Sequence, residues 1–397
     1  MTIRWLFSRQ VRRATEMNKH VRKLLNAQRD IMSPEASAAV AAAIEATTQV
    51  LENGGDSAAI ETQLQRLEKT ANQRFKPYPH AEWRENVEVF LVAIAVAMAI
   101  RTFVLQPFKI PTGSMQPTLF GITLENLNDR PDVAVPGLFG RINDYCVHGI
   151  SYHLLVAKED GQVVDVPKKE SLFFFINRQR IVVHYLGGED RTETETLWFA
   201  PEDRFKEYSG VEPGMQFKKG GFIVKLKETT GDHLFVDRLT YNFRHPKRGE
   251  IIVFQTKGIW PLPQDQFYIK RLVATPGETV QIGADRHVLI DSHRLDAATP
   301  HFENVYSFTG PPRKDAYSGH VHYGLLDPNA VTVPLFSTNQ TFQVRPHHFL
   351  VMGDNTMNSF DSRGWGDFPE GNVIGKSFFV YWPISNHGNS RFGWGVR

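Results

Sequence analysis

A serine in a stiff turn is the first residue of this sequence that could carry covalent chemistry. Ser114 follows Gly113 and lies between Pro111 and Pro117. Glycine permits a tight backbone and the close approach of a second chain, and the prolines restrict the flanks. Such a turn can present a nucleophilic hydroxyl with a backbone N–H free to donate to an oxyanion. Composition alone is more typical of an ordinary turn, and a serine nucleophile also needs a base.

The base for this serine is not an obvious histidine. No histidine lies in a recognisable triad motif, and the sequence has no G-x-S-x-G elbow. Lys270 is the other candidate, because alternation along a strand at 267–273 places it on one face with Tyr268 and Leu272. Burial among apolar groups lowers a lysine pKa, so a neutral Lys270 could take the serine proton. A lone lysine in a strand is, however, more often solvated.

A third polar segment lies at 352–367 and is dense in small and polar residues. It is typical of a hydrogen-bonded loop. The alternative is an acidic metal site made by Asp354, Asp361 and Asp367. Calcium loops have a different regular spacing and end in Glu, which this segment lacks. We therefore expect no metal.

A long apolar run lies just before the serine turn. Residues 86–106 are almost entirely apolar and are stopped by Pro107. About 20 such residues span a bilayer, with Glu88 and Arg101 near the two interfaces. The alternative is a buried core helix, which is uncommon next to a β domain. A cleaved signal peptide is disfavoured, because those segments occupy the first 15–30 residues.

The region before this run, 1–85, is predicted to be a helical hairpin on the cytoplasmic side. Its two apolar stripes have helical spacing and are separated by a turn at 54–56. The first stripe contains Val40, Ile44 and Leu51, and the second contains Ile60, Leu64, Leu67, Ala71 and Phe75. The first thirty residues carry eight Arg or Lys against Glu16 and Asp30. The positive-inside rule then places 1–85 in the cytoplasm and 107–397 outside.

From residue 108 onward the sequence is typical of a mostly antiparallel β domain. Short β-prone runs alternate with Gly- and Pro-containing turns, with neither a repeat nor a βαβ rhythm. These runs are 108–110, 163–164, 172–176, 180–184, 222–226, 250–254 and 267–273. We predict a mainly β fold for 107–397, preceded by the helical region and one transmembrane helix at 86–106.

Charge and cysteine content exclude several classes of function. The 397 residues contain 45 Lys and Arg against 43 Asp and Glu, a net charge of +2. Nucleic-acid binding normally needs a clear basic excess, so we expect no such partner. The single Cys146 rules out an internal disulfide and a cysteine-rich zinc site.

Taken together, the polar segments resemble the bacterial signal peptidases I, membrane-bound leader peptidases of the serine–lysine type. The resemblance is carried, in the family's order, by 106–119, 231–243, 246–254, 268–273 and 353–363. It implies an antiparallel β catalytic domain behind a membrane anchor. It also implies that Ser114 is the nucleophile and Lys270 the general base.

The resemblance implies supporting roles as well. The Ser114 N–H and the Thr112 hydroxyl would form the oxyanion hole, and Ser359 would hydrogen-bond to the Lys270 amine. Asp361 and Arg363 would form an ion pair, and Asp354 could pair with Arg271. Shallow pockets for small side chains would be lined by Phe108, Ile110, Met115, Leu119, Val253, Tyr268 and Ile269.

The sequence departs from the family in three places. Thr356 and Met357 replace residues that are often charged. A β insertion occupies about 122–230, and the cytoplasmic hairpin is unusually long. Neither of these two extra regions can be given a function from the sequence.

The expected function is removal of signal peptides from exported preproteins, after small residues of the Ala-X-Ala type, without a cofactor. The expected partners are preproteins and membrane lipid, and the expected state is a monomer in the bacterial inner membrane, crossing it once. Two alternatives are a specialised processing peptidase with few substrates and a catalytically silent envelope scaffold. Intact Ser114, Lys270 and Ser359 argue against silence.

Overall fold

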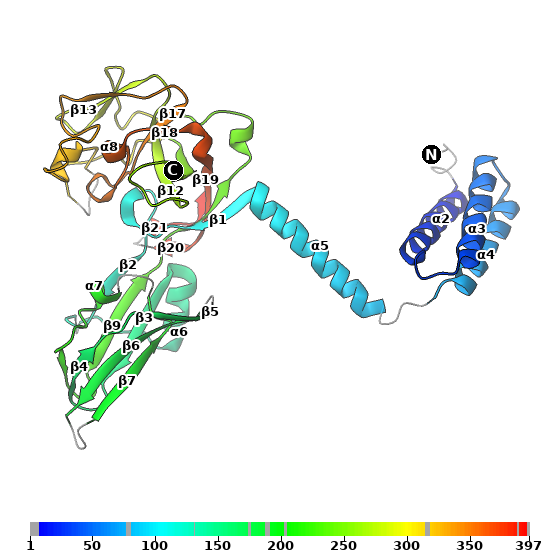
Figure 1. Ribbon diagram of the computed structural model, residues 1–397, viewed down its shortest axis with the longest axis horizontal. Coiled ribbons are helices and arrows are strands. Elements are labelled where there is room, and N and C mark those ends of the chain that lie inside the picture. The colour runs from blue at the N-terminus through cyan, green and yellow to red at the C-terminus, as the bar shows by residue number, and fades with distance from the viewer. Residues whose placement is uncertain are drawn as a thin grey trace. The chain divides into compact units, whose positions relative to one another are not determined.

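Two compact units divide the chain, Met1–Ala95 and Val96–Arg397. The computed structural model (Figure 1) describes residues 8–394 apart from 77–80, 131, 174–175, 187–190, 202–204, 314–317 and 387–388. Each unit has its own buried apolar clusters. The chemistry predicted from the sequence falls within the second unit.

Three helices form the core of the first unit, where the sequence predicted a hairpin of two. They are α2 (Arg9–Gln28), α3 (Pro34–Glu52) and α4 (Ser57–Arg74). Each begins at a side-chain cap, Ser8, Ser33 or Asp56, which accepts a hydrogen bond from the backbone N–H three residues later. The predicted hairpin of two helices is therefore wrong, because three helices pack together in this unit.

Helix α2 packs through a narrow apolar stripe that its basic residues obscure in the sequence. Val11, Ala14, Val21 and Leu25 are buried at helical spacing. Asn18 adds a polar contact, since its Nδ2 donates to the Ile44 carbonyl of α3 at 3.3 Å. The long cationic side chains of α2 remain on its exposed faces.

Helix α5 (Ala81–Phe103) carries the apolar run. Its segment Trp83–Phe103 is long and apolar enough to cross a membrane, with a mean hydropathy of 1.8 and no burial within the chain. The predicted bounds of 86–106 need correction at both ends. The helix begins earlier, and Leu105 and Gln106 already belong to the first strand of the β domain.

The main sheet of the second unit is entirely antiparallel and brings the three polar segments together. Its order is β1-β10-β19-β11-β12-β17-β18, with β22 also paired to β19. The strands are β1 (Leu105–Lys109), β10 (His233–Asp237), β11 (Ile251–Gln255), β12 (Phe267–Ala274), β17 (His348–Met352), β18 (Phe368–Pro369), β19 (Val373–Trp382) and β22 (Gly393–Trp394). Figure 1 shows β12, β17 and β18 close together beside the short helix α8 (Ser362–Trp365).

A smaller sheet and a third apolar cluster back this region. The sheet order is β15-β14-β13-β16, formed by β13 (Thr279–Ile282), β14 (Val288–Ile290), β15 (His293–Arg294) and β16 (Thr341–Gln343). Its apolar side chains pack with Val273 of β12 and Met352 of β17. The strands that carry the polar segments are thus fixed by a core on each side.

The residues between the serine turn and β10 form two further antiparallel sheets (Figure 1). One has the order β2-β9-β3; the other has β5-β6-β4-β8 with β7 paired to β6. The strands are β2 (Thr123–Asn126), β3 (Ile150–Val156), β4 (Gly161–Asp165), β5 (Glu170–Phe173), β6 (Ile176–Tyr185), β7 (Arg191–Trp198), β8 (Gln216–Phe217) and β9 (Phe222–Thr229). The run 172–176, predicted as one strand, is divided between β5 and β6, and residues 174–175 lie outside the described residues.

Candidate active site

Ser114 and Lys270 meet although 156 positions separate them. Ser114 lies in the short 3-10 turn η1 (Gly113–Met115), and Lys270 lies in the middle of β12. The Lys270 Nζ is 2.8 Å from the Ser114 Oγ and also donates to the Ile269 carbonyl at 3.1 Å. Only 6% of Ser114 and 5% of Lys270 is exposed. This is a hydrogen-bonded nucleophile and amine, sheltered from water.

Burial also sets the protonation of the amine. Removal from water lowers the pKa of Lys270 to about 8, because burial disfavours the ammonium. The negative charges of Asp361 and Asp354 oppose this shift, and the positive charge of Arg363 adds to it. A substantial fraction of Lys270 is therefore neutral slightly above neutral pH, where it can accept a proton.

The serine turn is held by the polar loop that follows β17. The Asn355 backbone N–H donates to the Ser114 carbonyl at 3.0 Å, and its side-chain Nδ2 donates to the Gly113 carbonyl at 3.1 Å. Close backbone approaches complete the fit. A Cβ on Gly121 would lie 2.2 Å from the Thr112 carbonyl carbon, and one on Gly231 would lie 1.8 Å from the Ile110 oxygen. Only glycine fits at these two positions.

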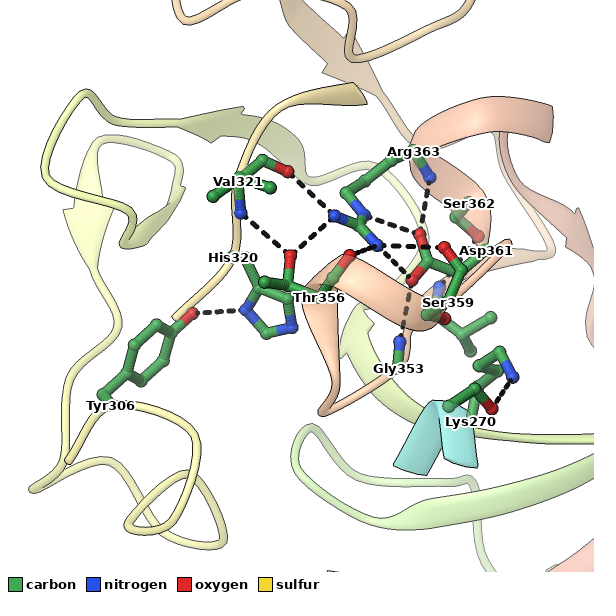
Figure 2. Close-up of polar contacts among 12 residues, drawn as sticks. Lys270, Tyr306, His320, Val321, Gly353, Thr356, Ser359, Asp361, Ser362 and Arg363 are labelled. Carbon is green, nitrogen blue, oxygen red and sulfur yellow. Dashed lines mark hydrogen bonds and ion pairs between the residues drawn. The ribbon is translucent and has the colours of Figure 1, made fainter. Parts of the chain in front are cut away.

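Arg363 holds the same loop together through hydrogen bonds to its backbone and side chains (Figure 2). It is completely buried and forms a two-bond ion pair with Asp361, at 2.8 and 2.9 Å. Burial alone would raise the pKa of Asp361, but the Arg363 charge, together with hydrogen bonds from Arg363 and the Gly353 N–H, holds that pKa below its usual value. Arg363 also donates to the Ser359 carbonyl at 3.2 Å and to the Thr356 Oγ1 at 2.6 Å. The predicted Asp361–Arg363 ion pair is present.

A second buried ion pair joins β12 to the loop. Arg271 donates to Asp354 through Nε at 2.7 Å and Nη2 at 2.5 Å, and each residue is 1% exposed. Thr118, from the chain just after the serine turn, donates to the same carboxylate. Arg271 follows Lys270 directly, so this pair fixes the strand register beside the amine.

One supporting side chain is not placed as the sequence predicted. The expected hydrogen bond from Ser359 to Lys270 is absent, and among the described residues the buried Ser359 Oγ has no hydrogen-bond partner. The Lys270 amine instead uses Ser114 and the Ile269 carbonyl. The Thr112 hydroxyl lies beside the serine, with its Oγ1 3.5 Å from the Ser114 Oγ.

The predicted pocket residues gather in space but are mostly core. Phe108, Ile110, Met115, Leu119, Val253 and Ile269 form one apolar cluster, whereas Tyr268 packs in the neighbouring one. Met115 and Leu119 have no exposed surface, so their assignment as pocket lining needs correction. They belong to the buried core on which the serine turn packs. Phe108, Tyr268 and Ile269 keep partly exposed surface that a substrate can touch.

The three carboxylates of the alternative metal site belong to separate ion pairs. Asp354 pairs with Arg271, Asp361 with Arg363, and Asp367 with Arg345. Across the described ranges, no group of three or more His, Cys, Asp or Glu could hold a metal ion. These acids therefore act as structural anchors for arginines.

Comparison with known proteins identifies one matching family. Residues 83–125 and 226–382 match the family described as "Signal peptidase, peptidase S26". Together, these segments make up slightly more than half of the chain. The chain belongs to this family. It is accordingly a serine peptidase, and its residues 126–225 fall outside the family match.

Relatives of this peptidase include bacterial signal peptidases I. That of Aquifex aeolicus (strain VF5) is 31% identical over 181 residues, covering 38% of this chain and 69% of the relative. That of Leptolyngbya laminosa is 31% identical over 160 residues, covering 40% and 63%. A crystal structure of a signal peptidase I from Enterococcus faecalis V583 aligns at 24% identity with a TM-score of 0.22, covering 34% of this chain and 97% of that chain. The aligned parts thus span about two thirds of the curated relatives' lengths.

Several residues that shape the peptidase site were missed by sequence reasoning. Asn355 was quoted only as part of a motif, yet it holds two carbonyls of the serine turn. Thr356 was noted only as a departure from the family, yet its Oγ1 accepts bonds from Arg363 and from the Val321 N–H at 3.0 Å. Arg391, near the C-terminus, pairs with Asp232 and donates to the Thr118 carbonyl at 3.0 Å. Of these three residues, only Thr356 could have been identified from the sequence, because it departs from the family motif.

Proposed function

We propose that this peptidase removes N-terminal signal peptides from exported preproteins by a Ser114–Lys270 dyad. The observation that carries the proposal is the 2.8 Å contact between the Ser114 Oγ and the Lys270 Nζ in a buried site. The lowered pKa of Lys270 supports its role as a general base. Family membership supports the class of substrate.

Acylation begins when neutral Lys270 takes the Ser114 proton as the Oγ attacks the scissile carbonyl carbon. The Ser114 N–H and the Thr112 hydroxyl stabilise the resulting oxyanion. As the C–N bond breaks, the Lys270 ammonium returns the proton to the leaving amine, which becomes the N-terminus of the mature protein. The signal peptide remains attached to Ser114 as an ester.

Deacylation uses the same amine. Neutral Lys270 takes a proton from water, the resulting hydroxide attacks the ester, and a second tetrahedral oxyanion forms in the same hole. When the ester C–O bond breaks, the ammonium protonates the Ser114 Oγ, and the signal peptide leaves as a carboxylic acid that releases its proton to bulk water as a carboxylate forms. The buried Arg363–Asp361 pair keeps the loop around this centre in one geometry.

Specificity for small side chains follows from the packed surface around the dyad. Phe108, Tyr268 and Ile269 provide the partly exposed apolar surface, while fully buried Met115 and Leu119 fill the space beneath. A bulky side chain would have to displace this core, which a well-packed interior resists. We propose cleavage after Ala-X-Ala.

Membrane anchoring by Trp83–Phe103 would place the dyad at a bilayer surface. The proposed orientation, with 1–85 in the cytoplasm and 107–397 outside, rests on the basic first thirty residues and on Arg74, Lys76 and Arg84. Protease added to sealed spheroplasts would digest 107–397 and spare 1–85; the reverse pattern would contradict this orientation.

Cleavage of a purified preprotein by the purified full chain tests the proposed function. We expect a single cut after an Ala-X-Ala site, identified by the N-terminal sequence of the product. Replacing the alanine before the cut with phenylalanine should lower kcat/KM by at least about 100-fold, because a large residue does not fit the packed site. Equal cleavage of both substrates, or undiminished cleavage by Ser114→Ala, would contradict the proposal.

A further inference from the structure

An open strand edge and an apolar groove lie mostly in the part of the chain that falls outside the family match. Strand β3 is the last strand of the sheet β2-β9-β3, so one of its two edges has no neighbouring strand. A groove of about 780 Å³ runs along this edge. It is lined mainly by 150–154 of β3, by 196–199 at the end of β7, and by the short helix α6 (Leu138–Asn143). The peptidase chemistry described above uses none of these residues.

The pairing of β3 with β9 shows which backbone groups of β3 point outward. The Thr230 N–H donates to the Gly149 carbonyl at 2.9 Å, and the same register continues along β3. In an antiparallel pair, hydrogen-bonded and non-hydrogen-bonded positions alternate. The N–H and C=O groups of Ile150, Tyr152 and Leu154 therefore point away from β9, and no other described strand pairs with them. These groups have the spacing of a strand, so their natural partner is the backbone of another extended chain.

Strand β3 lacks the features that normally protect an exposed edge. Its sequence, Ile150–Val156, contains neither a proline nor an Asp, Glu, Lys or Arg. By contrast, the edge strand β7 carries Arg191, Glu193 and Glu195. Charges and prolines on an edge oppose pairing with another chain. Trp198, which is 52% exposed, adds an apolar wall to the groove. The edge of β3 is thus suited to an added strand with apolar side chains.

The open edge begins close to the serine turn. Ile110, four residues before Ser114, donates its N–H to the Asp232 carbonyl at 2.9 Å. Two residues before Asp232, the Thr230 N–H binds Gly149, which directly precedes β3. This path is about 30 Å long at most, with ~3.5 Å for each residue and ~5 Å for each of the two strand crossings. About ten residues of an extended polypeptide that leaves the dyad can therefore reach the groove.

The helical wall of the groove is fixed to the main sheet. Helix α6 continues into the π-helical turn η2 (Asp144–His148). At the end of β19, the Trp382 Nε1 donates to the Cys146 carbonyl of this turn at 2.9 Å. The Tyr152 hydroxyl of β3 donates to the Asp144 carboxylate at 3.0 Å. A strand bound in the groove would therefore keep a constant position relative to the sheet that carries Lys270.

We propose that the open edge of β3 binds the mature segment of the preprotein, which pairs with β3 as an added strand and places apolar side chains against α6 and the end of β7. This inference rests on the proposed removal of signal peptides and identifies where the substrate is held beyond the dyad. A chain that has not yet folded exposes its apolar segments, and its backbone offers the N–H and C=O groups that match those of β3. Binding there lowers KM for preproteins whose mature segment is long enough to reach the groove.

Two preproteins that differ only in the length of the mature segment test this site. One has about 5 residues after the cut, too few to reach β3, and the other has about 30. We expect the purified full chain to cleave the longer one with a kcat/KM about tenfold higher, chiefly through a lower KM. Leu154→Pro should bring this ratio to about 1, because proline removes an outward N–H that the pairing with β9 does not use. Leu154→Ala keeps that N–H and, as the matched control, should keep most of the ratio.

Photocrosslinking locates the contact without altering the strand itself. In a Ser114→Ala, Cys146→Ser background, the chain has no other thiol and does not turn over its substrate. A benzophenone attached to Ile142→Cys lies in the groove, and one attached to Val164→Cys is the matched control, since the two native side chains are 51% and 46% exposed. We expect the longer preprotein to form severalfold more adduct at 142 than at 164, through residues after the cut.

The outcomes separate this site from the proposed function. Equal kcat/KM for the two preproteins, or equal adducts at 142 and 164, would overturn the binding site and leave the dyad intact. Adducts through the signal peptide, or with a second copy of the chain, would overturn it as well. Failure of the unaltered chain to cleave either preprotein would overturn the proposed function itself.

Discussion

Lys270→Ala should lower kcat/KM for preprotein cleavage by roughly 10^4-fold while leaving the fold intact. The loss is large because the amine acts in both proposed half-reactions. Folding is retained because Lys270 has no ion pair among the described residues, and its burial disfavours the charge. Lys270→Arg should fail equally, since a guanidinium stays protonated at any working pH. Initial cleavage rates and thermal unfolding of the purified variants provide the measurements.

A matched control distinguishes the loss of the proposed catalytic amine from the loss of any buried lysine. Lys225 in β9 is similarly buried, at 7% exposure, and donates to the Val133 carbonyl at 2.9 Å. Lys225→Ala should keep nearly full activity. If Lys225→Ala and Lys270→Ala lose activity to the same extent, or if Lys270→Ala cleaves at a tenth of the normal rate, the assignment of the base is wrong.

Asp354→Ala should lower the free energy of unfolding by about 3–5 kcal/mol. The variant leaves the Arg271 guanidinium charged, 1% exposed and without its carboxylate. Thr118 loses the same partner, so the serine turn is released together with β12. Denaturant unfolding of the peptidase, followed by tryptophan fluorescence, measures the change.

The double variant Arg271→Met with Asp354→Ala distinguishes an orphaned charge from lost packing. Removing both charges should restore a large part of the stability, because no unpaired buried ion remains. Thr118 still lacks a partner, so recovery should be incomplete. A double variant as unstable as Asp354→Ala would show that the ion pair is not what stabilises this loop.

The sequence predicts the elements of this fold better than their ends. Strand β12 was visible because its side chains alternate with a period of two, and the apolar helix was visible because about 20 apolar residues follow one another. Helix α2 of the first unit was missed because its buried stripe is narrow and lies among arginines and lysines. The end of α5 was misplaced because Leu105 is apolar, and only pairing with Asp237 assigns it to a strand.

In the candidate site, the contact between the two proposed catalytic residues and the two ion pairs are present as predicted, whereas Ser359, Met115 and Leu119, which lie in the same motifs, have other surroundings than expected. The Ser114–Lys270 contact and the Asp354–Arg271 and Asp361–Arg363 pairs follow the resemblance. By contrast, apolar type alone does not distinguish a pocket wall from the layer beneath it, so Met115 and Leu119 were misassigned. The two carbonyl contacts of Asn355 depend on loop geometry that no spacing rule encodes.

The pH dependence of acylation in a single turnover tests the central claim most directly, because it reports the protonation of the proposed base. Only neutral Lys270 can take the Ser114 proton, so the rate should rise with pH as the ammonium is lost. Its midpoint should lie at about 8, where burial places the pKa of Lys270, and not near the ordinary lysine value of about 10.4. A rate that is flat from about pH 6 to 10 with chemistry limiting, or a midpoint at the ordinary value, would contradict a buried lysine base.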